Sequence, residues 1–398
     1  MFYRVKVYKK IVAFWLSVIL VFIAGSHYIS KKKIRPVNES HGMSPQNLKI
    51  DDIYYHPEES DDNTEKVISM QRLEIASEYY KSNLKARSEF EDLLLEKGGE
   101  PVRSLIITGY RSGSKFLSFI LSAVPGNFHF NEPLMQFKGT VTIQIPPTQA
   151  NDAVTTLKSI FKCEVKGMEH YLHAVKYKRN PILTDHCNSS RLCEDAQYTS
   201  RFCKLFPFQN MKVTRLRLRY IEDILQDKDF SKLRAVLLVR DPRAVLRSRR
   251  PLPWCRPYRD CWDPALVCRA MVSDHRALVS LQDKFPNRLT AVRFEDLALN
   301  SSSEAKRLFH ALGRPLGAAV QEFLRAHTNS SRDLSPYSTF RVSRDVLFKW
   351  KEELDYKFVS QIQESCVEAM QLWGYRRAHS LQHLRSSHFM PLGAYSLH

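Results

Sequence analysis

Two segments far apart in the sequence share one pattern, an apolar run that ends in a turn rich in basic and small polar residues. The apolar runs cover residues 105–108 and 233–239. Neither run alternates polar with apolar residues, which is typical of parallel strands covered on both faces. Because parallel strands need crossover connections that are usually helical, the pattern predicts an α/β fold with a central parallel sheet flanked by helices.

The turn after the first run has the composition of a phosphate site. Two glycines allow close approach of a ligand, and the apolar spacing of residues 116–121 predicts a helix whose first amides can bind an anion. A Walker A loop would have four residues between its glycines and a Ser or Thr directly after the lysine. Here three residues separate Gly109 from Gly113, and Phe116 follows Lys115. The usual magnesium ligand is therefore missing, and an ordinary connection with surface charges is the alternative.

The turn after the second run has the same organisation. Asp241 and Pro242 are typical of a helix N-cap and of the first helical position. Arg240 stands at the carboxyl end of the predicted strand, where open α/β sheets bind ligands. Ser248 follows two helical turns later, so both side chains could contact one phosphate. The alternative for these arginines is a solvated helix face. Two anion sites together predict a ligand with two separate phosphates.

Together the two turns resemble the phosphosulfate-binding motifs of the sulfotransferases, and in particular those of the Golgi carbohydrate 6-O-sulfotransferases. In that family an Arg-Ser-Gly-Ser-Ser-Phe loop holds the 5'-phosphosulfate of 3'-phosphoadenosine 5'-phosphosulfate (PAPS). An Arg-Asp-Pro-Arg-Ala segment that ends in Ser-Arg holds the 3'-phosphate. Residues 111–116 match the first motif except at Lys115, and residues 240–249 match the second without a gap. Further matches extend the resemblance over roughly 102–377, at residues 130–134, 293–297, 337–341, 350 and 373–375.

The resemblance implies a P-loop-like sulfotransferase fold and PAPS as the cofactor. It also implies sulfuryl transfer to a sugar hydroxyl, the 6-O position of galactose, N-acetylglucosamine or N-acetylgalactosamine. Lys115 replaces a small hydroxyl residue, so it either adds charge at the 5'-phosphate or points away from it. The cofactor contacts implied are Arg111, Ser112, Gly113, Ser114, Lys115, Phe116, Leu117, Arg240, Asp241, Pro242, Arg243, Ala244, Val245, Leu246, Arg247, Ser248, Thr339 and Arg341.

Sulfuryl transfer is an in-line displacement in which positioning and charge stabilisation contribute most. Arg111, with Lys115 as a helper, is expected beside the leaving oxygen. The attacking sugar hydroxyl needs a general base, for which Glu132 is the candidate. An ion pair with an arginine of the two turns is the alternative role for Glu132. His129 is a second candidate base, although a histidine between two phenylalanines is more often a packed residue.

No metal is required by this chemistry, and the cysteines do not suggest a metal site. They form no Cys-x-x-Cys pair and no accompanying set of spaced histidines. Six of the eight fall into two clusters, at 187–203 and 255–268, and the even count favours disulfides formed in an oxidising compartment. Spacing does not determine their pairing. The cysteines are residues 163, 187, 193, 203, 255, 261, 268 and 366.

The amino-terminal residues predict a membrane anchor. Residues 11–25 carry no charge, and a weakly polar continuation gives a span of 11–29 that is just long enough for a thin bilayer. Basic residues flank both ends, so the positive-inside rule does not orient the span. A cleaved signal peptide is the alternative. We expect a single-pass type II protein of the Golgi membrane with a lumenal catalytic domain, and four glycosylation triplets follow the span at Asn38, Asn188, Asn300 and Asn329.

Composition divides the chain into five parts. A cytoplasmic tail of residues 1–10 and the anchor precede a stem of residues 30–100, of which 34–65 are poor in large apolar residues. Residues 66–97 regain apolar residues at helical spacing, as either a stem helix or the first helix of the catalytic domain. The catalytic domain covers 101–380 and a tail 381–398. A homodimer through the stem stays open, since no heptad pattern persists long enough to predict one.

The chain is basic, with 60 Lys and Arg against 42 Asp and Glu. Nucleic acid is not expected as a partner, because a lumenal protein does not meet it and no motif for RNA or DNA occurs. An anionic cofactor together with an anionic glycan or glycosaminoglycan acceptor accounts for the excess. Arg215, Arg217 and Arg219, on an edge strand or helix start, either line an acceptor groove together with Lys212 or form a plain surface.

Residues 290–297 predict one more buried strand, in which Arg293 and Glu295 pair with structural rather than catalytic roles. Two other functions stay open. A lumenal nucleotide-dependent glycan kinase would explain one turn but lacks the magnesium ligand. A non-catalytic glycan-binding protein with the same fold would explain the basic surface, but not Glu132 beside two phosphate sites.

Overall fold

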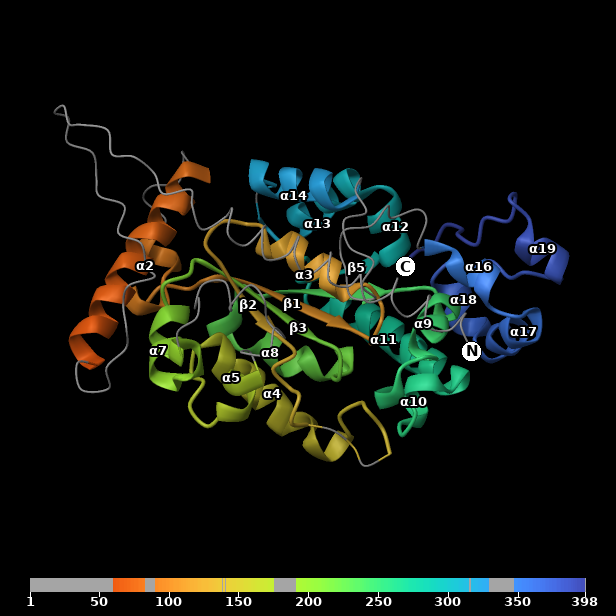
Figure 1. Cartoon of the computed structure of the whole chain (residues 1–398), viewed down its shortest axis with the longest axis horizontal. Coiled ribbons are helices and arrows are strands. Elements are labelled where there is room, and N and C mark those ends of the chain that lie inside the picture. The colour runs from red at the N-terminus through yellow and green to blue at the C-terminus, as the bar shows by residue number, and fades with distance from the viewer. Residues whose placement is uncertain are drawn as a thin grey trace, which may run out of the picture. The chain divides into compact units, whose positions relative to one another are not determined.

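The protein is built on a five-stranded parallel sheet with the strand order β2-β3-β1-β4-β5. The computed structural model describes residues 60–82, 90–137, 139, 141–174, 191–314, 316–328 and 347–397. Helices cover both faces of the sheet, which confirms the predicted α/β class (Figure 1). The strands are β1 (Val102–Thr108), β2 (Asn127–Asn131), β3 (Phe208–Val213), β4 (Arg234–Val239) and β5 (Leu289–Arg293).

The helices form two layers and an end group (Figure 1). The upper layer holds α3 (Ser114–Ser122), α12 (Phe294–Leu299), α13 (Ser301–Ala311) and α14 (Ala318–Thr328). The lower layer holds α4 (Pro147–Phe161), α5 (Glu169–Ala174), α7 (Ala196–Cys203), α8 (Glu222–Gln226) and α11 (Pro264–Lys284). The right-hand end holds α9 (Pro242–Arg249), α10 (Arg259–Trp262), α16 (Lys349–Glu353), α17 (Tyr356–Ser365), α18 (Val367–Leu372) and α19 (Leu381–Arg385).

One longer helix and several short 3-10 helices complete the described elements. Helix α2 (Ser60–Ser82) lies at the left-hand end of Figure 1. The 3-10 helices are η2 (Glu91–Leu93), η3 (Leu95–Lys97), η5 (Arg191–Glu194), η6 (Leu218–Ile221), η7 (Lys228–Phe230) and η8 (Pro253–Cys255).

The order of the strands fixes where a ligand can bind. After β1 the chain forms β2 and β3 on one side of it, and then crosses over to form β4 and β5 on the other side. The boundary between β1 and β4 is therefore a topological switch point, where open α/β sheets bind ligands outside the carboxyl ends of the strands. The two predicted turns follow β1 and β4, so the fold brings both to this boundary.

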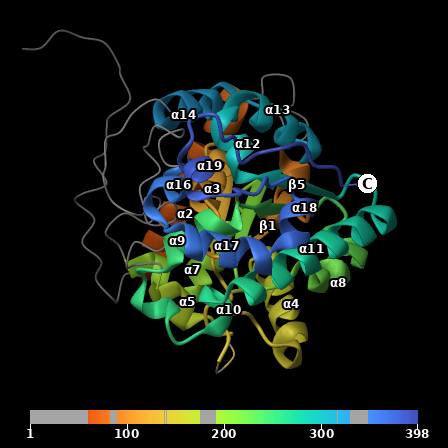
Figure 2. The ribbon, with the colours of Figure 1, turned by 90° about the vertical axis from the view of Figure 1, so that its right-hand side faces the viewer.

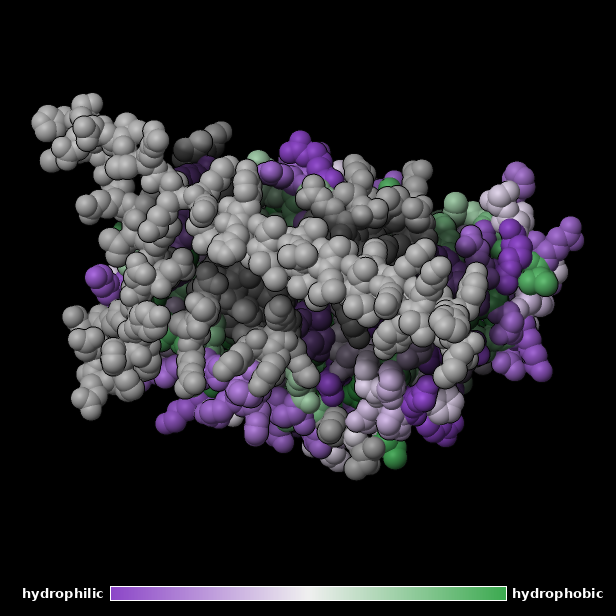
Figure 3. All heavy atoms as spheres, viewed as in Figure 1, coloured by the Kyte–Doolittle hydropathy of each residue, from purple (hydrophilic) through white to green (hydrophobic). Residues whose placement is uncertain are grey.

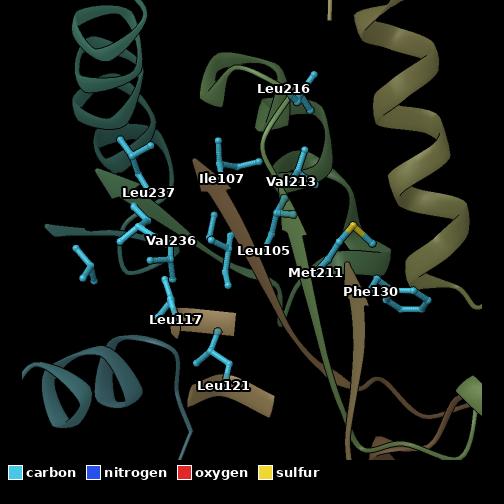
Figure 4. Close-up of a cluster of buried hydrophobic side chains, with 14 of the residues drawn as sticks. Leu105, Ile107, Leu117, Leu121, Phe130, Met211, Val213, Leu216, Val236 and Leu237 are labelled. Carbon is cyan, nitrogen blue, oxygen red and sulfur yellow. The ribbon is translucent and has the colours of Figure 1, made fainter. Parts of the chain in front are cut away.

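The core lies between the sheet and its helices (Figure 4). Leu105 of β1, Leu117 of α3 and Val236 of β4 are fully buried in one cluster with Met211 and Val213 of β3. Each such aliphatic side chain contributes about 1.5–3 kcal/mol when it is fully removed from water. The apolar runs that predicted β1 and β4 are thus the residues that hold the strands between two helical layers.

A buried arginine joins three strands near their amino ends, whereas the two turns lie at the carboxyl ends of the strands. Arg314 Nη1 donates to Asn127 Oδ1 at 3.0 Å, and Nη2 donates to the carbonyl oxygens of Val102 and Gln209 at 2.8 and 3.0 Å. Burial lowers the pKa of Arg314 to about 9. Because β2 and β3 also contain buried polar side chains, those of Asn127 and Gln209, neither strand shows an apolar run.

The predicted stem and tail both contain residues that pack against the sheet domain. Ile68, Ile75 and Tyr79 of α2 are buried in the same cluster as the strands, and so are Leu384 and Phe389 near the carboxyl end. Within the described residues no helix is long and apolar enough to span a bilayer. The predicted anchor, 11–29, lies outside the described residues, as do the glycosylation triplets at Asn38, Asn188 and Asn329.

The predicted disulfides are present. Cys163 bonds to Cys203, Cys255 to Cys261, and Cys268 to Cys366, and Cys193 is also disulfide-bonded. Among the three pairs, only Cys255–Cys261 lies within one of the two sequence clusters. The Cys268–Cys366 bond joins α11 to the junction of α17 and α18.

The strand predicted over 290–297 is only half correct. Strand β5 ends at Arg293, and α12 begins at Phe294. Glu295 and Asp296 fall in the first helical turn, where acidic side chains are stabilised by the helix dipole. Arg293 pairs with Asp296 at 2.8 Å rather than with Glu295.

Candidate active site

Three residues expected at the site, together with Thr214, which was not predicted, follow the carboxyl ends of four neighbouring strands. Arg111 comes shortly after β1, Glu132 directly after β2, Thr214 after β3 and Arg240 after β4. Because the strands are parallel, these ends meet at one edge of the sheet. The structure therefore brings the two turns and the candidate base together.

The first turn is shaped by unusual backbone conformations. Arg111 and Gly113 have φ angles of 64° and 89°, and α3 begins directly afterwards at Ser114. The first amides of a helix have no partner within it and can bind an anion. A Cβ atom on Gly113 would lie 2.2 Å from Cδ2 of Phe294. Glycine is thus required there by both conformation and space.

Hydroxyl groups hold this turn in place. Ser112 Oγ donates to the carbonyl oxygen of Gly109 at 2.6 Å and lies 2.5 Å from Thr108 Oγ1. Thr108 Oγ1 donates to the carbonyl oxygen of Leu238 on β4 at 2.7 Å. The Ser112 side chain, predicted as a cofactor contact, thus also supports the loop through these contacts.

The other predicted contacts of the first turn lie on α3. Ser114, Phe116 and Leu117 are buried, whereas Lys115 is exposed. Lys115 Nζ lies 5.3 Å from the centre of the Phe119 ring, one helical turn further on. The Lys115 ammonium group thus lies along α3, next to Phe119. This position corresponds to the second role considered for Lys115, in which its side chain points away from the 5'-phosphate.

The second turn is held by side chains. Asp241 caps α9 by accepting from the Arg243 amide at 2.9 Å, and its Oδ2 pairs with Arg243 Nη2 at 2.8 Å. Arg243 Nη1 donates to Gln363 Oε1 and to the carbonyl oxygen of Arg376, at 2.9 and 2.8 Å. The guanidinium group is fully buried over the ring of Trp350. Asp241 and Arg243 were predicted as cofactor contacts, and these interactions show that they also fix the start of α9.

The remaining predicted contacts on α9 are also mostly internal. Pro242, Ala244, Val245 and Leu246 are buried. Arg247 forms an ion pair with Glu353 on α16. The side chains of the second turn that remain at the site are those of Arg240 and Ser248.

The two turns meet at Arg111. Its Nε donates to Ser248 Oγ at 2.9 Å, and Arg240 Nη1 donates to the Arg111 carbonyl oxygen at 3.1 Å. Arg240 Nε is buried and has no hydrogen-bond partner among the described residues, while the guanidinium group lies over the Phe294 ring. Burial and then the charge of Arg111 lower the pKa of Arg240, against the raising effect of Glu295. An anion between Arg111 and Arg240 would relieve this repulsion.

Arg249, the last residue of the second motif, connects the first turn with a neighbouring loop. Its Nε and Nη2 donate to the Tyr110 carbonyl oxygen at 3.0 and 2.7 Å, and its Nη1 donates to the Cys261 carbonyl oxygen at 3.1 Å. Burial lowers the pKa of Arg249 to about 10, so it stays a cation near neutral pH. Arg249 thus fixes the first turn to the loop that the Cys255–Cys261 disulfide closes.

Glu132 is held in one orientation. Its backbone φ is 55°, and its amide donates to the Lys212 carbonyl oxygen at 2.9 Å. Its Oε2 accepts from Thr214 Oγ1 at 2.6 Å, and its Oε1 pairs with Lys212 Nζ at 3.1 Å. The side chain is 15% exposed, so it is within reach of a ligand. The pairing partner is Lys212 instead of the arginine considered as the alternative.

The Tyr110 ring lies near this carboxylate and contacts a second aromatic ring, and neither ring was predicted from the sequence. The rings of Tyr110 and Trp254 are 5.2 Å apart, and the Arg215 guanidinium lies 5.7 Å from the Tyr110 ring centre. Burial and the charge of Glu132 raise the pKa of Tyr110, so its hydroxyl stays protonated. Trp254 is 37% exposed and can present a ring face to a ligand.

His129 is not suited to be the second candidate base. It lies inside β2 with its Nδ1 3.1 Å from Asn210 Oδ1, and only 3% of it is exposed. Burial and then the nearby charge of Lys212 lower the pKa of His129 to about 3. It is a packed residue, as its two phenylalanine neighbours suggested.

The remaining predictions concern two cofactor contacts, a metal site and the basic residues near an acceptor. Thr339 and Arg341 lie outside the described residues. In the part of the chain that the structure describes, no group of His, Cys, Asp and Glu side chains could hold a metal ion. Of the basic residues expected near an acceptor, Arg217 directly precedes η6 and pairs with Asp274 at 3.0 Å, and Arg219 lies over the Tyr220 ring.

Comparisons with known proteins agree with this geometry. The sulfotransferase family matches residues 105–317. Human carbohydrate sulfotransferase 3 is 26% identical over 325 residues, which cover 69% of this chain and 67% of that protein. Mouse carbohydrate sulfotransferase 5 is 28% identical over 331 residues, which cover 71% and 82%.

Similar solved structures carry related names at lower identity. The sulfotransferase domain of the Synechococcus PCC 7002 olefin synthase is 18% identical with a TM-score of 0.38, and the match covers 66% of this chain and 94% of that one. Mouse sulfotransferase SULT7A1, complexed with adenosine 3',5'-bisphosphate (PAP), is 12% identical with a TM-score of 0.37, and the match covers 72% and 90%.

Proposed function

Because this chain belongs to the sulfotransferase family, we propose that it transfers a sulfuryl group from PAPS to a hydroxyl group of a glycan chain. In this proposal the acceptor is the 6-O position of galactose, N-acetylglucosamine or N-acetylgalactosamine. The observation that carries it is the meeting of two anion-binding turns at Arg111, through the 2.9 Å contact with Ser248 and the 3.1 Å contact with Arg240. Such an arrangement suits one ligand with two separate phosphates.

The residues at the two turns fit PAPS. Gly113 leaves room for close approach, and the amides at the start of α3 suit the 5'-phosphate end. The unpartnered Arg240 Nε and the Ser248 hydroxyl suit the 3'-phosphate. When bound, PAPS supplies the sulfuryl group that is transferred.

Glu132 is the residue that would take the proton of the acceptor hydroxyl at a carboxylate oxygen. Lys212 and Thr214 hold that carboxylate in place, so little reorganisation is needed before proton transfer. Arg111 would stabilise the negative charge that develops on the opposite side of the reacting group. The Tyr110 ring near Glu132, together with the Trp254 ring that it contacts, suits contact with a sugar ring.

Two substitutions test the assigned roles. Glu132→Gln keeps the shape of the side chain but removes the base, so turnover should fall by about 10²–10⁴-fold while PAP affinity stays near that of the unaltered protein. Arg240→Ala should weaken PAP binding by roughly 10–100-fold, as expected for a charged hydrogen bond. Calorimetry with PAP and transfer of label from radiolabelled PAPS to a glycan panel measure the two effects. Equal losses of PAP affinity in both variants would contradict the roles.

The same assay separates the other two functions. Transfer of label to sugar in the presence of a chelator supports the sulfotransferase. Use of ATP that stops when a chelator is added would indicate a glycan kinase instead. Retention of glycans without transfer would indicate a non-catalytic binding protein.

The proposed cellular setting is the Golgi membrane, with residues 11–29 as a type II anchor and the sulfotransferase domain in the lumen. The disulfides support an oxidising compartment. The Asn300 triplet supports a lumenal domain, since Asn300 is exposed at the start of α13. Treatment of intact microsomes with protease should leave the domain uncut and its Asn300 glycan in place, whereas cleavage without detergent would contradict this orientation.

A further inference from the structure

A cavity of about 480 Å³ lies at the end of the molecule that carries α9, α10 and α17. These helices lie side by side in both ribbon views (Figure 2). Its walls come from the carboxyl end of α9, from the loop closed by Cys255–Cys261, and from the first turns of α17. The volume is within the range of small-ligand sites, which run from about 300 to 1,000 Å³.

The walls carry an excess of positive charge, with four cationic side chains and one acidic side chain among the lining residues. Arg250, Arg256 and Lys357 line the cavity, are exposed, and make no side-chain hydrogen bond or ion pair with other described residues. The acidic side chain in the wall, Asp355, caps α17 by accepting from the Phe358 amide at 2.7 Å.

Other arginines close to the cavity behave differently. Arg247 pairs with Glu353, and Arg259 pairs with Asp263 at 2.9 Å. Hydrophilic side chains also dominate the right-hand end of the space-filling view (Figure 3). Among the described residues, acidic side chains are thus present nearby and pair with other arginines, but they do not pair with the basic side chains of the cavity. This excess of positive charge gives the cavity a preference for anions.

Two aromatic rings line the same walls. Trp262 is 46% exposed, and its Nε1 donates to the Arg256 carbonyl oxygen at 3.1 Å, which fixes the ring. The Arg250 guanidinium lies 5.4 Å from the centre of the Phe358 ring. Aromatic faces bind the apolar faces of flat or ring-shaped ligands, while arginine donors bind sulfate or carboxylate. The combination suits a sugar ring that carries an acidic group.

The cavity is separate from the proposed PAPS site. Leu246 and Arg250 stand two residues before and after Ser248, and two residues correspond to about 200° around a helix. The cavity therefore lies on the face of α9 opposite the Ser248 side chain that contacts Arg111. Arg249 lines the cavity and also donates to the Tyr110 carbonyl oxygen, so one residue connects the two places.

We propose that this cavity binds an acidic sugar residue of the acceptor glycan, one that carries sulfate or carboxylate and lies away from the transferred group. This inference rests on the proposed function, since it assumes a glycan acceptor. It adds that an acidic polymer is bound at a second place, outside the transfer centre. Acidic chains are then preferred over neutral chains of the same length.

The first test removes two charges from the cavity. The variant Arg250→Gln/Lys357→Gln should bind a chondroitin sulfate hexasaccharide at least tenfold more weakly than the unaltered protein, and its PAP affinity should not change. The control, Lys306→Gln/Arg325→Gln, removes the same charges from exposed sites on α13 and α14. The control should bind both ligands like the unaltered protein. Calorimetry with the hexasaccharide and with PAP provides the readouts.

The second test separates charge from ring contact. Trp262→Ala should weaken binding of the hexasaccharide and of its desulfated, carboxyl-reduced counterpart by a similar factor, because contact with a ring face does not depend on the acidic group. The double charge variant should affect the sulfated probe and leave the neutral probe unchanged. In transfer assays with acidic acceptor chains, the charge variant should raise KM and leave kcat unchanged.

Three outcomes would overturn the inference. A matching loss of PAP affinity in the double charge variant would make the cavity part of the nucleotide site. An equal loss in the control would reduce the effect to overall charge. Equal loss for sulfated and neutral probes in the double variant would exclude recognition of the acidic group. Failure of the proposed function has a different signature, which is lack of PAP binding by the unaltered protein.

Discussion

The turns after β1 and β4 both connect the carboxyl end of a strand to a helix, but different interactions determine their conformations. The first turn is determined by its backbone, with positive φ angles at Arg111 and Gly113, and α3 begins at the next residue. The second has ordinary backbone angles at its helix start and depends on the buried Asp241–Arg243 ion pair. The same strand-to-helix pattern in the sequence thus conceals two ways of making an anion site.

The difference predicts how each turn responds to substitution. A turn made of backbone fails when a side chain is added, because the space and the φ angles are already fixed. A turn made of side chains fails when a charge is removed, because its partner is then left buried without compensation. The substitutions below test this contrast, from the largest expected effect to the smallest.

Removal of the Arg243 side chain should have the largest effect. Arg243→Ala leaves Asp241 buried without its partner, so the free energy of unfolding should fall by about 3–5 kcal/mol. Chemical denaturation measures this change. Arg247→Ala, which breaks an exposed ion pair on the same helix, should cost less than about 1 kcal/mol. If both variants lose equally little, the second turn does not depend on its buried pair.

Glu295 should give the second turn a pH-dependent stability. It accepts from the Asp241 amide and from Tyr375 Oη, and burial followed by the charge of Asp241 raises its pKa to about 7, from an ordinary value of 4.5. Since the unfolded chain loses this proton first, the group's contribution to stability should fall by up to about 3 kcal/mol between pH 4.5 and 7.

The variant Glu295→Gln should flatten this pH dependence, which denaturation curves at several pH values would reveal. The matched control is Glu304→Gln on α13, whose half-buried carboxylate pairs with the exposed Arg307 and has no contact with the second turn, so the pH dependence should stay as in the unaltered protein. A profile of Glu295→Gln that still falls from pH 4.5 to 7 would assign the effect to another group.

A single added methyl group should disable the first turn. In Gly113→Ala the new Cβ meets the Phe294 ring, and the left-handed backbone alone costs about 1–2 kcal/mol. PAP affinity should fall at least tenfold, as measured by calorimetry. Gly317→Ala is the control, since a Cβ at Gly317 meets nothing within 4 Å. Unchanged PAP affinity in Gly113→Ala would show that the backbone of this turn does not bind the ligand.

The smallest effect is expected where the two turns touch. Ser248→Ala removes the hydroxyl that contacts Arg111 Nε and should weaken PAP binding by a few fold, as expected for about 0.5–1.5 kcal/mol. Titration with PAP and with adenosine 5'-monophosphate distinguishes the two phosphates. Only PAP should be affected, and an equal change for both nucleotides would place Ser248 at the 5' end.

The sequence predicted those parts of the fold whose physics is local. Apolar runs identified β1 and β4, and the Asp-Pro pair located the start of α9. Strands β2 and β3 escaped detection because Asn127, Gln209 and Asn210 are buried polar residues whose side chains are satisfied by partners far along the chain. No pattern in a single sequence reveals such pairings.

The site was predicted to a similar extent. Glu132, Arg111 and Arg240 lie where the two turns and the neighbouring motif placed them. Tyr110 and Thr214 were missed because an isolated tyrosine or threonine has no distinctive spacing, and their roles depend on contacts between strands. The buried contacts of Arg243 were not predicted for the same reason, since its partners Gln363 and Arg376 are distant in sequence.

The bond between Cys268 and Cys366 has a practical consequence. The two cysteines are 98 positions apart in the sequence. A cross-link over that separation restricts the conformations of the unfolded chain and so raises its free energy by about 4–5 kcal/mol. Protein produced in a reducing host would lose this constraint, and with it the support that the carboxyl-terminal helices give to Arg243. Recombinant material for all the measurements above should therefore be made by export to an oxidising space such as the bacterial periplasm or a eukaryotic culture medium.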